Sequence, residues 1–292
     1  MMRIVPRAAR DELGEGLLWS ARDNAVYWTD IIGKKLWRLN LADEAVRHWD
    51  MPEMIGWIIE RASGGFVVGL QSGFYRLSLE PFMLELIANP HPERPGNRLN
   101  DAKADAWGRI WAGSMPVADG PPSAWPATGA LYRLDPDGGV SCHDDGLTIA
   151  NGPALSPDGC TLYHTDSARS IVYRFALAAD GTLGPRDVHL VFPPDIGAPD
   201  GMACDATGGL WIAFYHHDPA YLSRVARFLP SGAFDREIRV PTAHVTNLIF
   251  AGQNLDRMFI TSASGGRCDP NAGALFEVDP GCSGLAPHPF GG

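Results

Sequence analysis

The feature that most constrains the fold of this chain is an internal repeat that runs along all of its 292 residues. Short apolar segments typical of β-strands recur six times, and by subtraction their central residues lie 40, 44, 52, 48 and 48 positions apart: Tyr27, Val67, Trp111, Tyr163, Trp211 and Phe259. A turn containing Gly or Asn precedes most of them, as in Ala206-Thr207-Gly208-Gly209. Such residues supply the positive φ of tight turns, so each copy is expected to contain a β-hairpin.

A second motif follows each apolar segment, with the apolar/polar alternation of a half-buried strand, as in Leu131-Tyr132-Arg133-Leu134. Hairpins with further strands at this spacing are typical of β-propeller blades. We therefore predict an all-β fold: a single domain, 1–292, forming a six-bladed β-propeller with four-stranded antiparallel blades around a central channel. A sandwich of unrelated strands is disfavoured because two motifs repeat in phase. Residues 3–7 are expected to complete the last blade as its outer strand, since an open ring would leave unpaired strand edges.

Composition limits the partners of the chain. The formal net charge is −10 and no basic run occurs, which disfavours nucleic acid and anionic membranes. No apolar run approaches the roughly 18 residues of a membrane span, and the N-terminus lacks a secretory signal. The five cysteines include no C-x-x-C pair, so reduced thiols are expected: Cys142, Cys160, Cys204, Cys268 and Cys282. We expect a cytoplasmic protein that is a monomer or a weak homo-oligomer.

Polar residues interrupt the repeat where four of the blades begin: Glu15, Asn100, Asn151 and Asp200. Residues at equivalent entry positions of different blades converge on the axis of a propeller. Carboxylate and amide oxygens are the donors that calcium, magnesium and manganese prefer. Taken singly, Asn-Gly and Asp-Gly are common turn dipeptides. Their shared phase in the repeat favours a metal site on the axis, and Asn247 enters blade six at the same phase.

Four segments resemble the SMP-30/gluconolactonase/regucalcin family over essentially the whole chain: Gly14-Glu15-Gly16, Asn97-Arg98-Leu99-Asn100-Asp101, Asn151-Gly152-Pro153-Ala154 and Pro199-Asp200-Gly201-Met202. The resemblance implies a divalent metal ion held by Glu15, Asn151 and Asp200, and hydrolysis of a sugar lactone such as glucono-, galactono-, arabinono- or xylonolactone. It further implies that Arg98 and Asn100 contact the substrate and that Asp200 is the general acid/base. The metal could be Ca, Mg, Mn, Zn or Fe(II).

Two departures from the family pattern bear on the substrate. Leu17 follows Gly14-Glu15-Gly16 where the family usually has proline. In the segment 116–128, Trp125 falls near the place where some members have an acidic substrate contact. Loops of this kind set specificity, so the sugar stays open.

Several alternatives also stay open. The proton of the attacking water could be taken by Asp200 or by metal-bound hydroxide. The same fold could hydrolyse organophosphates or other esters, or could bind calcium without turnover as a regulator. Asp101 is expected to be structural because neighbouring residues of a strand point in opposite directions. The pairs His164/Asp166 and His216/His217 are expected to lie outside the catalytic set.

Overall fold

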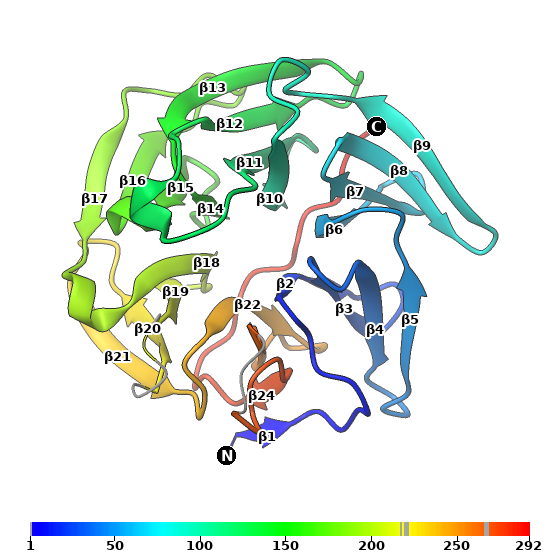
Figure 1. Cartoon of the computed structure of the whole chain (residues 1–292), viewed down its shortest axis with the longest axis vertical. Coiled ribbons are helices and arrows are strands. Elements are labelled where there is room, and N and C mark those ends of the chain that lie inside the picture. The colour runs from blue at the N-terminus through cyan, green and yellow to red at the C-terminus, as the bar shows by residue number, and fades with distance from the viewer. Residues whose placement is uncertain (1, 217, 219–221, 266–268) are drawn as a thin grey trace.

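Six four-stranded antiparallel sheets surround a common axis in this computed structural model, which describes residues 2–216, 218, 222–265 and 269–292 (Figure 1). The predicted six-bladed β-propeller is confirmed. The first strand of each blade contacts the first strands of the adjacent blades around the axis. These strands are β2 (Gly14–Ser20), β6 (Ile55–Glu60), β10 (Asn97–Ala104), β14 (Ala150–Leu155), β18 (Ala198–Cys204) and β22 (Val245–Ala251).

The six apolar segments of the repeat form the second strands, which are almost wholly buried. They are β3 (Ala25–Asp30), β7 (Phe66–Leu70), β11 (Ile110–Pro116), β15 (Thr161–Asp166), β19 (Leu210–Tyr215) and β23 (Arg257–Ser262). The alternating motif forms the third strands, β4 (Lys35–Asn40), β8 (Gly73–Leu79), β12 (Gly129–Leu134), β16 (Ile171–Ala176), β20 (Arg224–Phe228) and β24 (Phe276–Val278).

The outer strands carry more exposed residues: β5 (Val46–Asp50), β9 (Phe82–Ala88), β13 (Val140–Leu147), β17 (Asp187–Val191) and β21 (Phe234–Arg239). Blade six takes its outer strand from the N-terminus, because β1 (Arg3–Ile4) pairs with β24 and Val5 N donates to Leu275 O at 2.9 Å. The predicted closure is confirmed, although the paired strand is shorter than residues 3–7. Three short 3₁₀ helices complete the fold: η1 (Pro122–Ala124), η2 (Ser167–Arg169) and η3 (Pro194–Ile196).

Aspartate, tryptophan and arginine side chains build equivalent corners in blades three and five. Asp205 follows β18, and its carboxylate accepts bonds from Trp211 Nε1 at 2.9 Å and Arg227 Nε at 2.6 Å. Asp105 follows β10 and accepts the corresponding bond from Trp111 Nε1, while its arginine partner is Arg109, which comes just before the second strand instead of from the third. Each carboxylate also caps backbone amides of its hairpin turn. Each buried charge is therefore both paired and hydrogen-bonded, the condition under which burial is tolerated.

The chain ends in a segment without regular structure, residues 279–292, which we call the C-terminal strap. It crosses the middle of the ring from blade six towards blade two (red in Figure 1). Gly284 N donates to Leu255 O, Phe290 N donates to Glu60 O and Gly291 N donates to Gly108 O. The Phe290 side chain is 1% exposed and packs in the core between blades two and three. The strap therefore connects blades that are distant in sequence.

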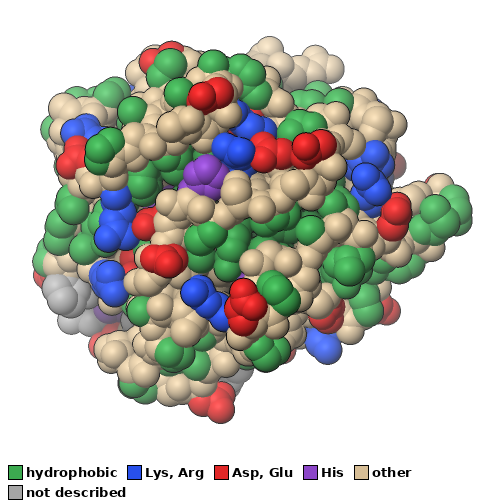
Figure 2. All heavy atoms as spheres, turned by 90° about the horizontal axis from the view of Figure 1, so that it is seen from above, with side chains coloured by type: hydrophobic (Ala, Val, Ile, Leu, Met, Phe, Trp, Pro, Cys, Tyr) green, Lys and Arg blue, Asp and Glu red, His purple; other side chains and the backbone are tan. Residues whose placement is uncertain are grey.

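The surface is mixed in character. On the face of Figure 2, acidic and basic side chains are interspersed, and the hairpin of β8 and β9 projects from the body. Among the described residues no helix combines the length and apolar character needed to cross a membrane. The four described cysteines, Cys142, Cys160, Cys204 and Cys282, are free thiols, as predicted, whereas Cys268 lies outside the described residues.

Candidate active site on the propeller axis

An irregularity shared by all six blades directs side chains toward the axis. In every blade the register between the first and second strands shifts near the start of the first strand, for example between Glu15 and Leu18. Bulges of this kind re-aim side chains and are enriched beside active sites. The shifted segments contain Glu15, Asn100, Asn151, Asp200 and Asn247. The local distortion, combined with the repeat, explains why residues far apart in sequence meet.

Glycines beside these residues allow the first strands to approach closely. Gly16 has a φ of +54°, and a Cβ there would lie 2.4 Å from Gly56 O of the neighbouring blade. A Cβ on Gly201 would lie 2.4 Å from Cγ of Asn247. Only glycine fits both positions without movement of its neighbours.

A cavity of about 300 Å³ opens over the shifted segments. The five site residues predicted from the sequence all line it: Glu15, Arg98, Asn100, Asn151 and Asp200. Trp125, Pro122 and Gly120, from the segment 116–128, form part of its rim with Met115 and Ile149. The cavity therefore has polar groups at one end and an apolar rim.

A chain of hydrogen bonds orients the amide side chains. Arg98 Nη1 donates to Asn100 Oδ1 at 2.6 Å, and Asn100 Nδ2 donates to Asn151 Oδ1 at 2.7 Å. Asn151 Nδ2 in turn donates to Ser167 Oγ at 2.9 Å. Because an amide oxygen has two lone pairs, Asn151 Oδ1 retains one for a further ligand.

The carboxylates near the axis come from the first strands of blades one, three and five. Glu15 Oε2 accepts from Asn247 Nδ2 at 2.8 Å, and the same nitrogen lies 3.2 Å from Asp101 Oδ2. Asp200 Oδ1 is buried and has no hydrogen-bond partner within the part of the chain that the structure describes. A buried carboxylate oxygen without a partner is costly, so this atom is suited to bind a cation or a hydrogen-bond donor.

Burial and mutual repulsion change the ionisation of these groups. Burial, with the charge of Asp101, raises the pKa of Glu15 to about 8. Burial, with Glu15 and Asp101, raises the pKa of Asp200 well above its ordinary range. Arg98 is 7% exposed, and burial lowers its pKa to about 10 although Glu15 and Asp200 oppose the change. Two buried carboxyl groups, Glu15 and Asp200, act on one guanidinium, and this excess of acid suits a bound cation.

Comparison with known proteins identifies the family of the chain. The model of the SMP-30/gluconolactonase/LRE-like region matches residues 13–264. The chain belongs to this family. It is 33% identical to the 6-deoxy-6-sulfogluconolactonase of Pseudomonas putida, covering 93% of each chain, and 31% identical to regucalcin of Gallus gallus, covering 97% of this chain and 96% of that one. The structure of a luciferin-regenerating enzyme superposes with a TM-score of 0.91 at 26% identity, covering 100% of this chain and 99% of the other.

In this member of the SMP-30/gluconolactonase family, the structure also locates Asp101 and Leu17. Asp101 does not line the cavity. It accepts a hydrogen bond from Asn247, and its negative charge raises the pKa of Glu15. Leu17, the departure from the usual proline, is 3% exposed and packs in the core between blades one and six. Among the described residues no group of three or more His, Cys, Asp or Glu side chains could hold a metal. The candidate set instead contains two carboxylates and an amide.

The described members of the two histidine pairs do not line the cavity. His164 Nε2 lies 3.0 Å from Asp144 Oδ2, while Asp166 accepts bonds from Thr148 N and Ile149 N. Neither His164 nor His216 lines the cavity, and His217 lies outside the described residues.

Sequence reasoning missed Ser167, which lines the cavity and bonds Asn151. The sequence could have indicated Ser167 through its position directly after β15, because β15 pairs with β14, the strand that carries Asn151.

Proposed function

We propose that the chain is a divalent-metal-dependent lactonase that opens an aldonolactone to the aldonic acid. The observation that carries the proposal is the convergence of Glu15, Asn151 and Asp200 on one cavity with Arg98 and Asn100. The Pseudomonas putida relative named a sulfogluconolactonase supports the substrate class. The relatives named regucalcin, together with a solved structure whose name describes regucalcin as a calcium-binding protein, support a bound divalent cation.

The residues present fit a divalent cation of the oxygen-preferring class. The unpartnered Asp200 Oδ1, the Glu15 carboxylate and the second lone pair of Asn151 Oδ1 are hard oxygen donors on one cavity. A cation held there would act as a Lewis acid on the lactone carbonyl and would offset the charge of the developing oxyanion. Calcium, magnesium, manganese, zinc and iron(II) are all compatible with such donors, and the physiological ion is a matter for measurement.

In the proposed reaction, protein side chains transfer the proton and orient the substrate. The oxygen of a water forms a bond to the lactone carbonyl carbon, and the bond from this carbon to the ring oxygen breaks. In this proposal Asp200 takes the proton from the water and returns it to the departing ring oxygen. The Arg98 guanidinium makes no ion pair within the described chain, so its other nitrogens are available to sugar oxygens or to the carboxylate product. Asn100 holds Arg98 and Asn151 in their orientations.

The test is an assay of five- and six-carbon aldonolactones, with a phosphotriester for comparison, on metal-free protein and after addition of each metal. Asp200→Asn and Glu15→Gln should each lose at least roughly 100-fold in kcat/KM while remaining folded. Glu85→Gln and Asp187→Asn, which alter exposed carboxylates on outer strands, are matched controls that should retain activity.

Full activity after exhaustive chelation, or in either axial variant, would refute the metal mechanism. Preference for the phosphotriester would assign the site to another ester class. Tight metal binding without turnover of any lactone would indicate a calcium-binding regulator.

A further inference from the structure

A second pocket, of about 350 Å³, lies at the other end of the first strands. Its lining includes Ala104, Leu155 and Cys204, each at or next to the end of a first strand, whereas the site residues lie near the starts of the same strands. The two pockets therefore open on opposite faces of the ring. Both are within the size range of small-molecule sites, about 300–1,000 Å³.

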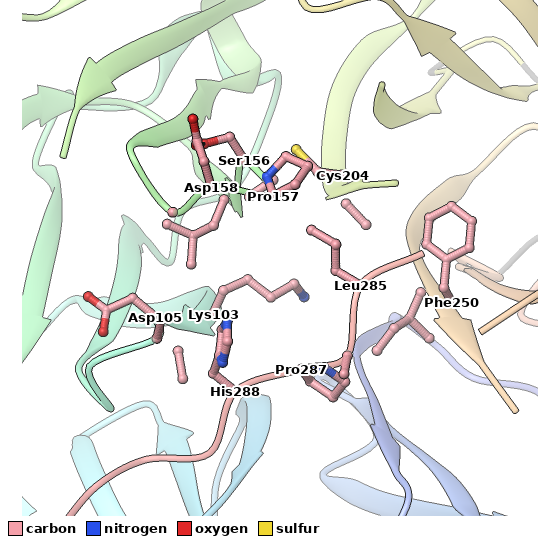
Figure 3. A pocket seen from close by; sticks show the side chains of 18 residues that line it. Lys103, Asp105, Ser156, Pro157, Asp158, Cys204, Phe250, Leu285, Pro287 and His288 are labelled. Atoms are coloured by element: carbon pink, nitrogen blue, oxygen red, sulfur yellow. The ribbon is translucent and has the colours of Figure 1, made fainter. Parts of the chain in front are cut away.

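The C-terminal strap covers this second pocket, with Leu285, Ala286, Pro287 and His288 in its lining (Figure 3). Backbone bonds fix the strap on both sides of this stretch. Ser283 O accepts from Ala206 N at 2.9 Å, and Phe290 exchanges bonds with Glu60 O and Ala62 N. The intervening residues therefore bridge the pocket while the segments on either side are held on blades five, six, two and three.

Most of the wall is apolar, from side chains that include Leu155, Ile249, Phe250 and Leu285. Two carboxylates also belong to the lining, but both are already engaged. Asp105 accepts from Arg109 and Trp111, and Asp158 accepts from Ser156 Oγ and Cys160 N. In Figure 3 both carboxylates point away from the middle of the pocket.

Besides His288 of the C-terminal strap, one basic side chain belongs to the lining, that of Lys103. Figure 3 shows its side chain extending into the pocket toward Leu285. The residue is partly buried, and its ammonium makes no hydrogen bond or ion pair within the described residues. The charge of Lys103 acts on Asp101, two residues before it on β10, but this carboxylate accepts its hydrogen bonds from Ala102 N and Asn247 Nδ2 and forms no ion pair with the ammonium among the described residues. A partly buried ammonium in an apolar wall is stabilised by an anion.

The composition of the chain makes this lysine unusual. Only three of its 24 basic residues are lysines: Lys34, Lys35 and Lys103. Lys34 and Lys35 lie at a turn and the start of β4, and Lys35 pairs with Asp50 at 2.5 Å. Lys103 is thus the lysine that combines a cavity with an unpaired charge.

We propose that this pocket binds a small carboxylic acid anion with an apolar body, distinct from the lactone and its product. The carboxylate contacts the Lys103 ammonium, and the apolar body lies against Leu155, Ile249, Phe250 and Leu285. An aldonic acid fits poorly because it carries a hydroxyl on nearly every carbon and this wall offers few free polar groups. The proposal does not depend on the lactonase activity.

The test is a titration of the full-length protein, selectively ¹³C-labelled on lysine, with octanoate. The Lys103 side-chain signal should shift and saturate, while those of Lys34 and Lys35 stay in place as internal controls. Lys103→Met should weaken octanoate binding at least tenfold by calorimetry, and Lys103→Arg should retain most of it. Lys34→Met is the matched control. Octanamide, which lacks the charge, should bind wild-type protein at least tenfold more weakly than octanoate.

Equal shifts of all three lysine signals, or undiminished binding in a folded Lys103→Met protein, would overturn the proposal. Stronger binding of gluconate than of octanoate at Lys103 would overturn the apolar character assigned to the ligand. All these readouts are binding measurements, so their outcome is separate from that of the lactonase assay.

Discussion

The side-chain amide of Asn247 donates to the carboxylate of Glu15 across a distance of 2.8 Å and a sequence separation of 232 residues. The same nitrogen lies 3.2 Å from Asp101 Oδ2, and Asn247 Oδ1 accepts from Leu248 N. Asn247 is therefore fixed between two carboxylates behind the proposed metal site. It positions Glu15 without lining the cavity itself.

Asn247→Ala should lower metal affinity or kcat/KM by roughly 10- to 100-fold, the usual effect of losing a partner of a metal ligand. It should also lower the free energy of unfolding by about 1–3 kcal/mol, because the buried Glu15 Oε2 loses its side-chain donor and keeps only the longer bond from Gly16 N. Metal titration by calorimetry and kinetics at saturating metal separate the two effects. Unchanged metal affinity together with unchanged kcat/KM would show that Glu15 is positioned without Asn247.

The raised pKa of Glu15 predicts a pH dependence of stability in the metal-free protein. Its pKa rises from an ordinary value of 4.5 to about 8 in the folded chain. Between these values the folded state holds a proton that the unfolded state has released, so stability falls as pH rises through this window. The melting temperature of chelated wild-type protein should fall across pH 5–8, and the fall should be smaller in Glu15→Gln.

A divalent metal should reverse this trend, since binding requires the deprotonated carboxylate. Metal affinity should therefore increase with pH up to about 8, with release of protons measurable in buffers of different ionisation enthalpy. A metal affinity independent of pH would contradict the assignment of Glu15 as a ligand.

The repeat was sufficient to predict the ring of blades and the convergence of Glu15, Asn100, Asn151 and Asp200, whereas Arg98 followed only from the resemblance to the family. Glu15, Asn151 and Asp200 occupy one phase of the repeat, and a propeller places equal phases at equal depth along the axis. The position of Asp101 was harder to predict from the sequence. Strict alternation separates it from Asn100, but the register shift between Leu99 and Ala102 brings both near the axis. Alternation does not reveal a bulge.

The C-terminal strap was not predictable for a different physical reason. Its residues follow no strand period and contain Pro and Gly, which indicate only irregular structure. Its position depends on contacts across the whole chain, such as the bond from Phe290 N to Glu60 O. Residues of this strap line the second pocket, so the pocket could not be predicted from the sequence either.

Asp205 should contribute to stability at neutral pH and lose that contribution in acid. Hydrogen bonds from Arg227, Thr207 and Trp211 hold the pKa of Asp205 well below its ordinary value despite burial. A lowered carboxyl pKa stabilises the fold above the unfolded pKa of 3.8, and the stabilisation is lost as pH falls below that value.

Asp205→Asn should therefore lower the free energy of unfolding by about 3 kcal/mol at pH 7, because it leaves Arg227 short of a partner in the buried corner. The difference from wild type in urea denaturation should shrink as the pH is lowered toward 3. Asp187→Asn, which removes an exposed partner of Arg174, is the matched control with little effect. A difference that stays constant with pH would show that the carboxylate charge is not responsible.

Deletion of residues 1–5 should destabilise the ring. It removes β1, leaves β24 with an unpaired edge and takes the buried Val5 out of the core. The loss of Val5 alone corresponds to about 1.5–3 kcal/mol, so the melting temperature should fall by roughly 5 °C or more. Glu44→Gln, which alters only the exposed ion pair with Arg3, is the control. An unchanged melting temperature would show that β1 does not contribute to closure.

Trp125 should determine how tightly the substrate is held rather than how fast it reacts. Its indole Nε1 lies 3.1 Å from both Asp119 O and Gly120 O of its own loop, while the residue lines the cavity rim. The ring is thus held in place and offers an apolar surface to the C–H groups of a sugar. Trp125→Ala should raise KM roughly tenfold with little change in kcat, since contact with a remote part of the substrate is equal in ground and transition states.

Trp125→Phe keeps an aromatic surface and should restore most of the affinity. Metal affinity, measured by calorimetry, should be the same in both variants. The hydrogen bonds of Trp125 go to Asp119 O and Gly120 O and not to any of the three proposed metal ligands. A fall in kcat with unchanged KM would instead place Trp125 in the chemical step. Loss of metal binding in Trp125→Ala would mean that the rim loop supports the axial ligands, and the segment 116–128 would then be structural rather than a determinant of specificity.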